Sequence, residues 1–101
     1  MSKLQQFKDV LQGLDFRESK KNIFSKVYTK NADEEVVKMG MMYKITPTKI
    51  KFYMIDTLGH SHLNMTCKVK DLKFSDDGID TANWKEYKGR EKSKQFDFNK
   101  L

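Results

Sequence analysis

The stretch VKMGMMYKITPTKIKFYMIDTLGHSHLNMTCKV, residues 37–69, decides the fold of this chain. Apolar residues alternate with lysines and small polar residues in three segments, 37–45, 50–54 and 63–69. Two short polar segments separate them, and the first contains the only proline, which favours a tight turn. Strict alternation predicts strands with one buried and one wet face, and the short loops predict that neighbouring strands pair antiparallel.

The segments before this stretch add a helix and a further strand. Residues 2–14 place apolar side chains at helical spacing. Ser2 is a favourable N-cap, and Gln5 three residues later completes a capping box. Residues 23–29 are rich in residues that favour strands, so they predict a strand between the helix and the alternating stretch.

The C-terminal third gives competing signals. Residues 80–87 fit a short helix, and residues 95–98 alternate as a last strand would. The whole chain predicts an α+β fold, with an N-terminal helix packed on an antiparallel β-meander of four to five strands and a short C-terminal helix or strand. A helix before a five-stranded meander also fits a closed small barrel of the Sm or SH3 type. With 101 residues, we expect a single domain, 1–101.

Composition limits the classes of function. The formal net charge is +6, and 18 of the 20 basic residues are lysines. Lysine is a hydrated point charge, so it favours non-specific attraction to phosphate over the reading of base edges. The single cysteine, Cys67, excludes an intrachain disulfide. We expect a cytoplasmic protein, because no signal peptide and no apolar run of about 18 residues is found.

The wet face of the predicted meander is the candidate functional surface. Alternation places its lysines on one side of strands that lie about 4.8 Å apart, and like charges opposite each other weaken a sheet. Tyr53 is expected to be exposed among them and to stack on a base. The candidate nucleic-acid-binding residues are Lys38, Lys44, Lys49, Lys51, Tyr53, Lys68 and Lys70. Lysines are also ordinary residues of a wet sheet face, so a plain solubility role competes with this hypothesis.

A protein partner is the second hypothesis. Met42 is expected to be exposed among the lysines, and Trp84 and Tyr87 share one side of the predicted short helix. The two aromatic residues either dock that helix on the sheet or anchor an interface. The alternative function is thus a small inhibitor or regulator, of the type that phages encode, that docks on a larger protein with an acidic surface. An exposed edge strand also permits a homo-oligomer.

No pattern predicts catalysis, a metal or a cofactor. His60 and His62 are close to Cys67 in sequence, but strand register puts both histidines on the side opposite the cysteine. This disfavours a zinc site and also a nucleophile with its base. The five glycines are scattered singly, so they build no phosphate-binding loop. We expect a non-enzymatic protein that binds nucleic acid, RNA or single-stranded DNA, and that has no cofactor and no membrane contact.

Overall fold

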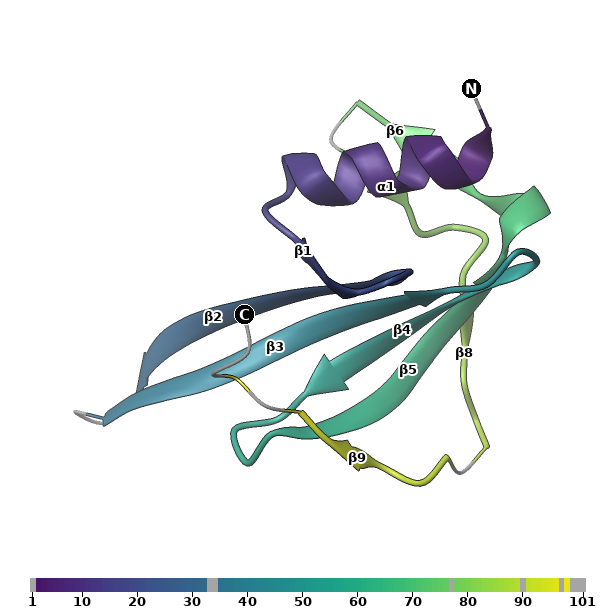
Figure 1. Ribbon diagram of the computed structural model, residues 1–101. Helices are drawn as coiled ribbons and strands as arrows, with labels where there is room; N and C mark the ends of the chain where they lie inside the picture. The colour runs from purple at the N-terminus through teal and green to yellow at the C-terminus, as the bar shows by residue number, and fades with distance from the viewer. Residues whose placement is uncertain (1, 33–34, 77, 90, 97, 99–101) are drawn as a thin grey trace.

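A computed structural model describes residues 2–32, 35–76, 78–89, 91–96 and 98, and within 30–36 only the course of the strands. One helix lies across one face of a twisted antiparallel sheet (Figure 1). The elements in chain order are α1 (Lys3–Gly13), β1 (Arg17–Lys20), β2 (Ile23–Ala32), β3 (Glu35–Ile45), β4 (Lys49–Ile55), β5 (His60–Lys68), the 3₁₀ turn η1 (Val69–Asp71), β6 (Lys73–Ser75), β7 (Gly78–Asp80), β8 (Lys85–Glu86) and β9 (Lys94–Gln95).

The sheet is an open meander. Strands β1 to β5 follow one another in chain order, each antiparallel to the one before. The outer edge of β5 then pairs with two short strands, β8 and β9, while β6 and β7 form a separate hairpin. The predicted α+β class and meander are confirmed. The barrel alternative is wrong, because β1 and β8 lie at opposite ends of the strand order and do not pair.

Helix α1 begins where the sequence predicts. The Ser2 hydroxyl accepts a hydrogen bond from the Gln5 N–H at 3.1 Å, as expected for an N-cap. The Gln5 side chain donates along the helix to the Asp9 carboxylate at 3.0 Å. Phe7 and Leu11 are both 0% exposed, so the helix is fixed to the sheet by its apolar stripe.

Each face of the sheet carries an apolar cluster. The larger one lies under α1 and includes Phe7 and Tyr43, whose rings meet edge to face with centroids 5.3 Å apart. The smaller one, on the opposite face, consists of Met42, Tyr53 and Ile55, packed against partly buried apolar residues that include two phenylalanines near the C-terminus. The meander is therefore covered on both faces, and not on one alone as its alternation predicts.

A β-bulge in β5 changes the predicted register. The partner of Phe52 is Met65, whereas the partner of Tyr53 is Leu63, so Asn64 is the extra residue. Leu63 consequently packs into the smaller cluster, although alternation places it with Met65. The bulge also puts His62 and Cys67 on the same face, so the prediction of opposite faces is wrong. A single extra residue reverses every side chain beyond it.

The short helix predicted for residues 80–87 is not formed. Trp84 is 8% exposed, and its ring centroid lies 6.3 Å from that of Phe7 in the larger cluster. The residues after it pair with β5 as β8, and the Tyr87 N–H donates to the Asn64 carbonyl at 3.0 Å. Packing of one tryptophan thus overrides a weak local pattern. Of the predicted strand 95–98, only Gln95 lies in a strand, β9; Phe96 and Phe98 lie outside it, and residue 97 is not among the described residues.

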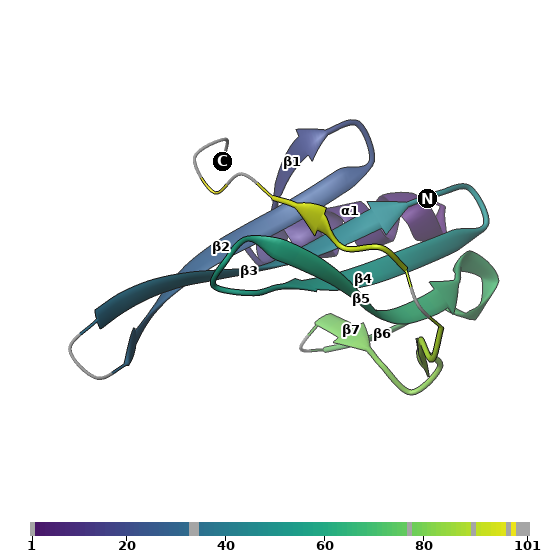
Figure 2. The ribbon, with the colours of Figure 1, turned by 90° about the horizontal axis from the view of Figure 1, so that it is seen from below.

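The β2–β3 hairpin extends beyond the rest of the sheet (Figures 1 and 2). Strand β4 pairs with β3 only as far as Gly40, and β1 pairs with β2 only at residues 23–25. Beyond these points β2 and β3 pair with each other alone, as far as Ala32 and Glu35. The sheet therefore ends in a two-stranded ribbon.

Candidate nucleic-acid interface

Cross-strand register gathers lysines from three strands into one row. Lys44 of β3 lies opposite Lys51 of β4, which lies opposite Thr66 of β5. Thr66 in turn lies opposite Lys85 of β8. Because neighbouring strands are about 4.8 Å apart, this row crosses about 14 Å of one sheet face.

A second row lies two residues further along the same face. Lys49 of β4 is directly opposite Lys68 of β5, and both side chains are exposed. Together with Lys85 these two lysines line a cleft of about 240 Å³, which also has Asp71 and Asn83 in its wall. We call Lys44, Lys49, Lys51, Lys68 and Lys85 the lysine face.

Lys44 is a partly buried lysine of this face with other lysines near it. Burial lowers the pKa of its ammonium group, and the nearby charges of Lys94, Lys51 and Lys20 lower it further, while Glu91 raises it. The Lys44 ammonium also lies 4.9 Å from the centre of the Tyr53 ring. An added anion beside Lys44 therefore meets a group whose positive charge it stabilises.

The prediction that Met42 and Tyr53 are exposed is wrong. Both lie on the lysine face, as alternation requires, but they are only 7% and 3% exposed. The C-terminal segment covers this part of the face, with Phe96 and Phe98 packed against the smaller cluster. In this arrangement the Tyr53 ring is not available for stacking on a base.

A carboxylate of the chain itself lies at the boundary between the covered and open parts. The Tyr53 hydroxyl donates to Glu91 at 2.7 Å, and the Lys51 ammonium lies 3.8 Å from the other oxygen of the same carboxylate. Burial, followed by this hydrogen bond, raises the pKa of Tyr53. Glu91 thus occupies a position at the lysine face that suits an anion.

Two of the predicted lysines lie away from the face. Lys38 is on the ribbon, six residues along β3 from Lys44 and therefore about 20 Å away. Lys70 lies in η1 outside the sheet, and its carbonyl accepts a hydrogen bond from Lys3 at 2.7 Å. Sequence reasoning missed Lys85, because a helix was predicted where β8 forms.

The three predicted protein-contact residues do not share a surface. Met42 is buried in the smaller cluster, whereas Trp84 is buried on the other face in the larger one. Of the two alternatives left open for Trp84, docking on the sheet is the one found. Tyr87 is half-buried beside β5.

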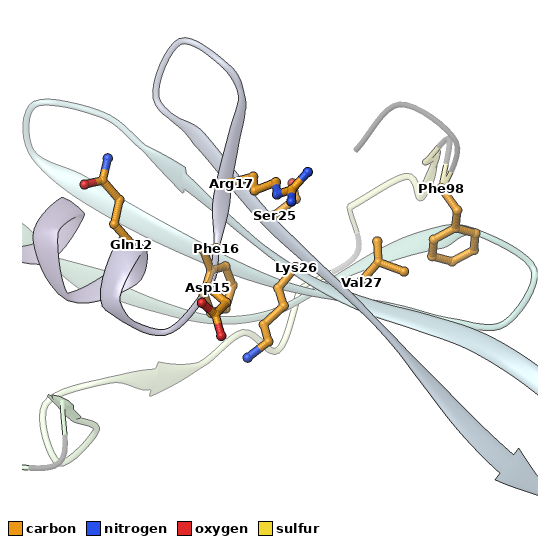
Figure 3. A pocket seen from close by; sticks show the side chains of 8 residues that line it. All are labelled: Gln12, Asp15, Phe16, Arg17, Ser25, Lys26, Val27 and Phe98. Carbon is orange, nitrogen blue, oxygen red and sulfur yellow. The ribbon is translucent and has the colours of Figure 1, made fainter.

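A groove of about 600 Å³ lies beside β2 at the start of β1 (Figure 3). Ser25 in its wall is 0% exposed, and its hydroxyl has no hydrogen-bond partner among the described residues. Arg17 is the cross-strand neighbour of Ser25, and the two side chains lie together in Figure 3. On the helix side of the groove, Lys26 donates to the Leu14 carbonyl at 2.9 Å.

The histidines lie near one carboxylate. His62 Nε2 is 2.9 Å from Asp56, and this hydrogen bond is the main cause that lowers the pKa of Asp56. Burial raises the pKa of the Cys67 thiol, which makes it a poorer nucleophile. Among the residues that the structure describes, no three His, Cys, Asp or Glu side chains are grouped to hold a metal ion. The described helices include none with the length and apolar character needed to cross a membrane.

Comparison with known proteins finds no matching family model, no matching curated protein and no matching solved structure. The geometry and charge of the chain itself are therefore the basis for a function.

Proposed function

We propose that this protein is a non-enzymatic binding protein that holds RNA or single-stranded DNA, without sequence preference, on the lysine face. The observation that carries this proposal is the direct opposition of like charges, Lys44 to Lys51 and Lys49 to Lys68. Like charges opposite each other destabilise a sheet. A bound polyanion removes this repulsion, so the same residues that weaken the free protein favour the complex.

The kind of side chain supports phosphate binding over base reading. The five residues that define the lysine face are all lysines, which lack the planar fork with which arginine suits the edges of guanine. The aromatic ring predicted to stack on a base, Tyr53, is covered by the C-terminal segment. Contacts to the backbone of a nucleic acid supply affinity but little sequence information. Non-specific binding follows from these two features.

Binding of labelled single-stranded RNA and DNA oligonucleotides across a salt series tests the proposal. With four or five phosphates neutralised, the logarithm of the binding constant should fall against the logarithm of salt with a slope of about −3. This corresponds to a loss of roughly 50- to 100-fold between 50 and 200 mM salt. Binding that is independent of salt, or absent at low salt, contradicts the proposal.

A pair of matched variants locates the site. Lys49→Glu/Lys68→Glu changes the lysine face, and Lys8→Glu/Lys73→Glu changes α1 and β6; each brings the net charge from +6 to +2. We expect the first variant to weaken binding at least about tenfold and to flatten the salt slope by about 1.4, and the second to change affinity less than about threefold. Equal losses in both variants would mean that net charge, and not this face, attracts the ligand.

The alternative function, an inhibitor or regulator that docks on a larger protein, has less support. Burial of Met42 and Trp84 on opposite faces leaves it without the contact surface expected for it. An acidic protein surface suits the same five lysines. Failure of both oligonucleotides to bind at low salt would favour that partner.

A further inference from the structure

One edge of β2 is open along the ribbon. From Lys26 to Ala32 this strand pairs with β3 on one side, and no strand among the described residues pairs with the other side. The groove of Figure 3 lies beside Lys26 and Val27, so the start of this edge borders open space. Unpaired strand edges are templates for pairing with another chain.

The hydrogen bonds of the hairpin fix which backbone groups of β2 are unpaired. The Ile45 N–H donates to the Asn22 carbonyl at 2.9 Å, directly before the first β2–β3 pair. In an antiparallel pair such bonded residues alternate with residues directed away from the partner strand. Val27, Thr29 and Asn31 therefore direct both their N–H and their C=O groups outward, away from β3.

We propose that two copies of the chain pair through these edges as a two-fold symmetric dimer centred on Thr29. When Thr29 lies opposite Thr29 of the second copy, Val27 lies opposite Asn31 of that copy. Each outward N–H then meets an outward C=O, and about six interchain hydrogen bonds form. The free edges, residues 26–32 in both copies, have the same length and overlap fully in this register.

A second copy fits this edge better than the other free edge of the ribbon. Beyond Gly40 the open edge of β3 contains Lys38, and a symmetric pairing centred on Lys38 would place two lysines directly opposite each other. Lys26 and Lys30 also lie on the β2 edge, but in this register Lys26 is opposite Ala32 and Lys30 is opposite Tyr28 of the second copy, so no two lysines are directly opposite. Threonines directly opposite each other are a favourable cross-strand pair. The contact is also closed by its symmetry, because each copy uses its one β2 edge, so it forms no filament.

The proposed dimer does not depend on whether the lysine face binds nucleic acid. A two-fold axis through an antiparallel pair is perpendicular to the sheet, so the same face of both copies lies on the same side. The two lysine faces would then form one surface on a continuous sheet. If the proposed function holds, the dimer contacts more phosphates on one strand than a single copy does, and its salt dependence is steeper.

Sedimentation equilibrium of the nucleic-acid-free protein, from micromolar to millimolar concentration, tests the dimer. The mass should rise from 11.9 kDa toward twice that value. Thr29→Pro removes the central outward N–H, and we expect it to stay monomeric, whereas the matched variant Thr29→Val retains the N–H and should dimerise as the wild type does.

If the proline variant does not fold, Thr29→Asp tests the same dimer interface. It places two carboxylates opposite each other on the axis and should raise the dimer dissociation constant at least about tenfold at neutral pH. A wild-type protein that stays monomeric at millimolar concentration overturns the proposal. A dimer that persists unchanged in Thr29→Asp overturns it as well, because its interface would lie elsewhere.

Discussion

The two faces of the sheet differ in what covers them. On one face α1 lies across the strands and contributes Phe7 and Leu11, both fully buried. On the other face an irregular C-terminal segment contributes Phe96 and Phe98, which are only partly buried and reach only one part of the face. The fully covered face is a core. The partly covered face leaves a row of lysines open, and it is therefore the one that can meet a ligand.

The two covers are also attached differently. The helix is held by a continuous apolar stripe, whereas the C-terminal segment is held by the two-residue strand β9 and a few turn contacts. Among these are the bonds from Phe96 N–H to the Gly59 carbonyl at 2.6 Å and from Gln95 to the Leu58 carbonyl at 3.0 Å. Gly59 has a φ of +85°, and a Cβ there would lie 2.5 Å from the Gln95 side chain. The position of the C-terminal segment on the sheet therefore depends on a few contacts.

The largest difference in stability is expected when one aromatic ring is removed from α1 and, in a second variant, from the C-terminal segment. Phe7→Ala leaves a cavity under α1, and we expect it to lower the free energy of unfolding by about 3–5 kcal/mol. Phe96→Ala removes a half-exposed ring and should cost about 1–2 kcal/mol. Urea denaturation followed by far-UV circular dichroism measures both. Similar losses in the two variants would contradict the difference between the covers.

The substitution Glu91→Gln tests the role of the carboxylate that lies between the C-terminal segment and the lysine face. The amide oxygen can still accept the hydrogen bond from Tyr53, but the negative charge beside Lys51 is removed. If the lysine face binds nucleic acid, affinity should rise about three- to tenfold, equivalent to about 0.7–1.4 kcal/mol. Fluorescence anisotropy with a labelled oligonucleotide measures this change.

Glu86→Gln is the matched control for this variant. Glu86 is exposed on β8 and lies opposite Met65, whose side chain packs in the larger cluster under α1. Glu86→Gln removes one negative charge, as Glu91→Gln does, but from the other face of the sheet. The affinity for the oligonucleotide should therefore change less than about twofold. If the two variants raise affinity equally, the Glu91 carboxylate does not compete with the ligand.

Alternation in the sequence was enough to predict that Lys44, Lys49, Lys51 and Lys68 share a face, but not that Lys70 lies outside the sheet or that Lys85 joins the lysine face. The period of two in β3 and β4 places Lys44 and Lys51 on one side, and the short turn between them sets their register. It does not predict what covers that side. Met42 and Tyr53 are buried by residues 96 and 98, more than forty positions further along the chain. Only long-range packing brings that segment there.

Two further errors have local causes. The bulge at Asn64 leaves no clear mark in a segment where polar and apolar residues still alternate, so the side of Leu63 was predicted wrongly. Residues 80–87 are too short for their period to distinguish a helix from a strand. Trp84 decides the outcome by packing on Phe7 and Tyr43, both distant in sequence.

The smallest expected effect on stability is found by comparing substitutions of two buried serines on the partly covered face. Ser61 donates to the Lys94 carbonyl at 3.1 Å and so holds β9, whereas the Ser25 hydroxyl has no partner among the described residues. Loss of a hydrogen bond lowers stability by about 1 kcal/mol, while removal of an unpaired buried hydroxyl is neutral or stabilising by up to about 1 kcal/mol. Ser61→Ala should therefore destabilise the protein and Ser25→Ala should not.

Urea midpoints at equal protein concentration give the sign of each change. The opposite signs matter more than the magnitudes, because the two substitutions remove the same atom from sites of similar burial, 0% exposed for Ser25 and 5% for Ser61. If Ser25→Ala destabilises as much as Ser61→Ala, the Ser25 hydroxyl has a partner in solution. Since Ser25 lines the groove beside the open edge of β2, that partner would be a water or another molecule bound in the groove.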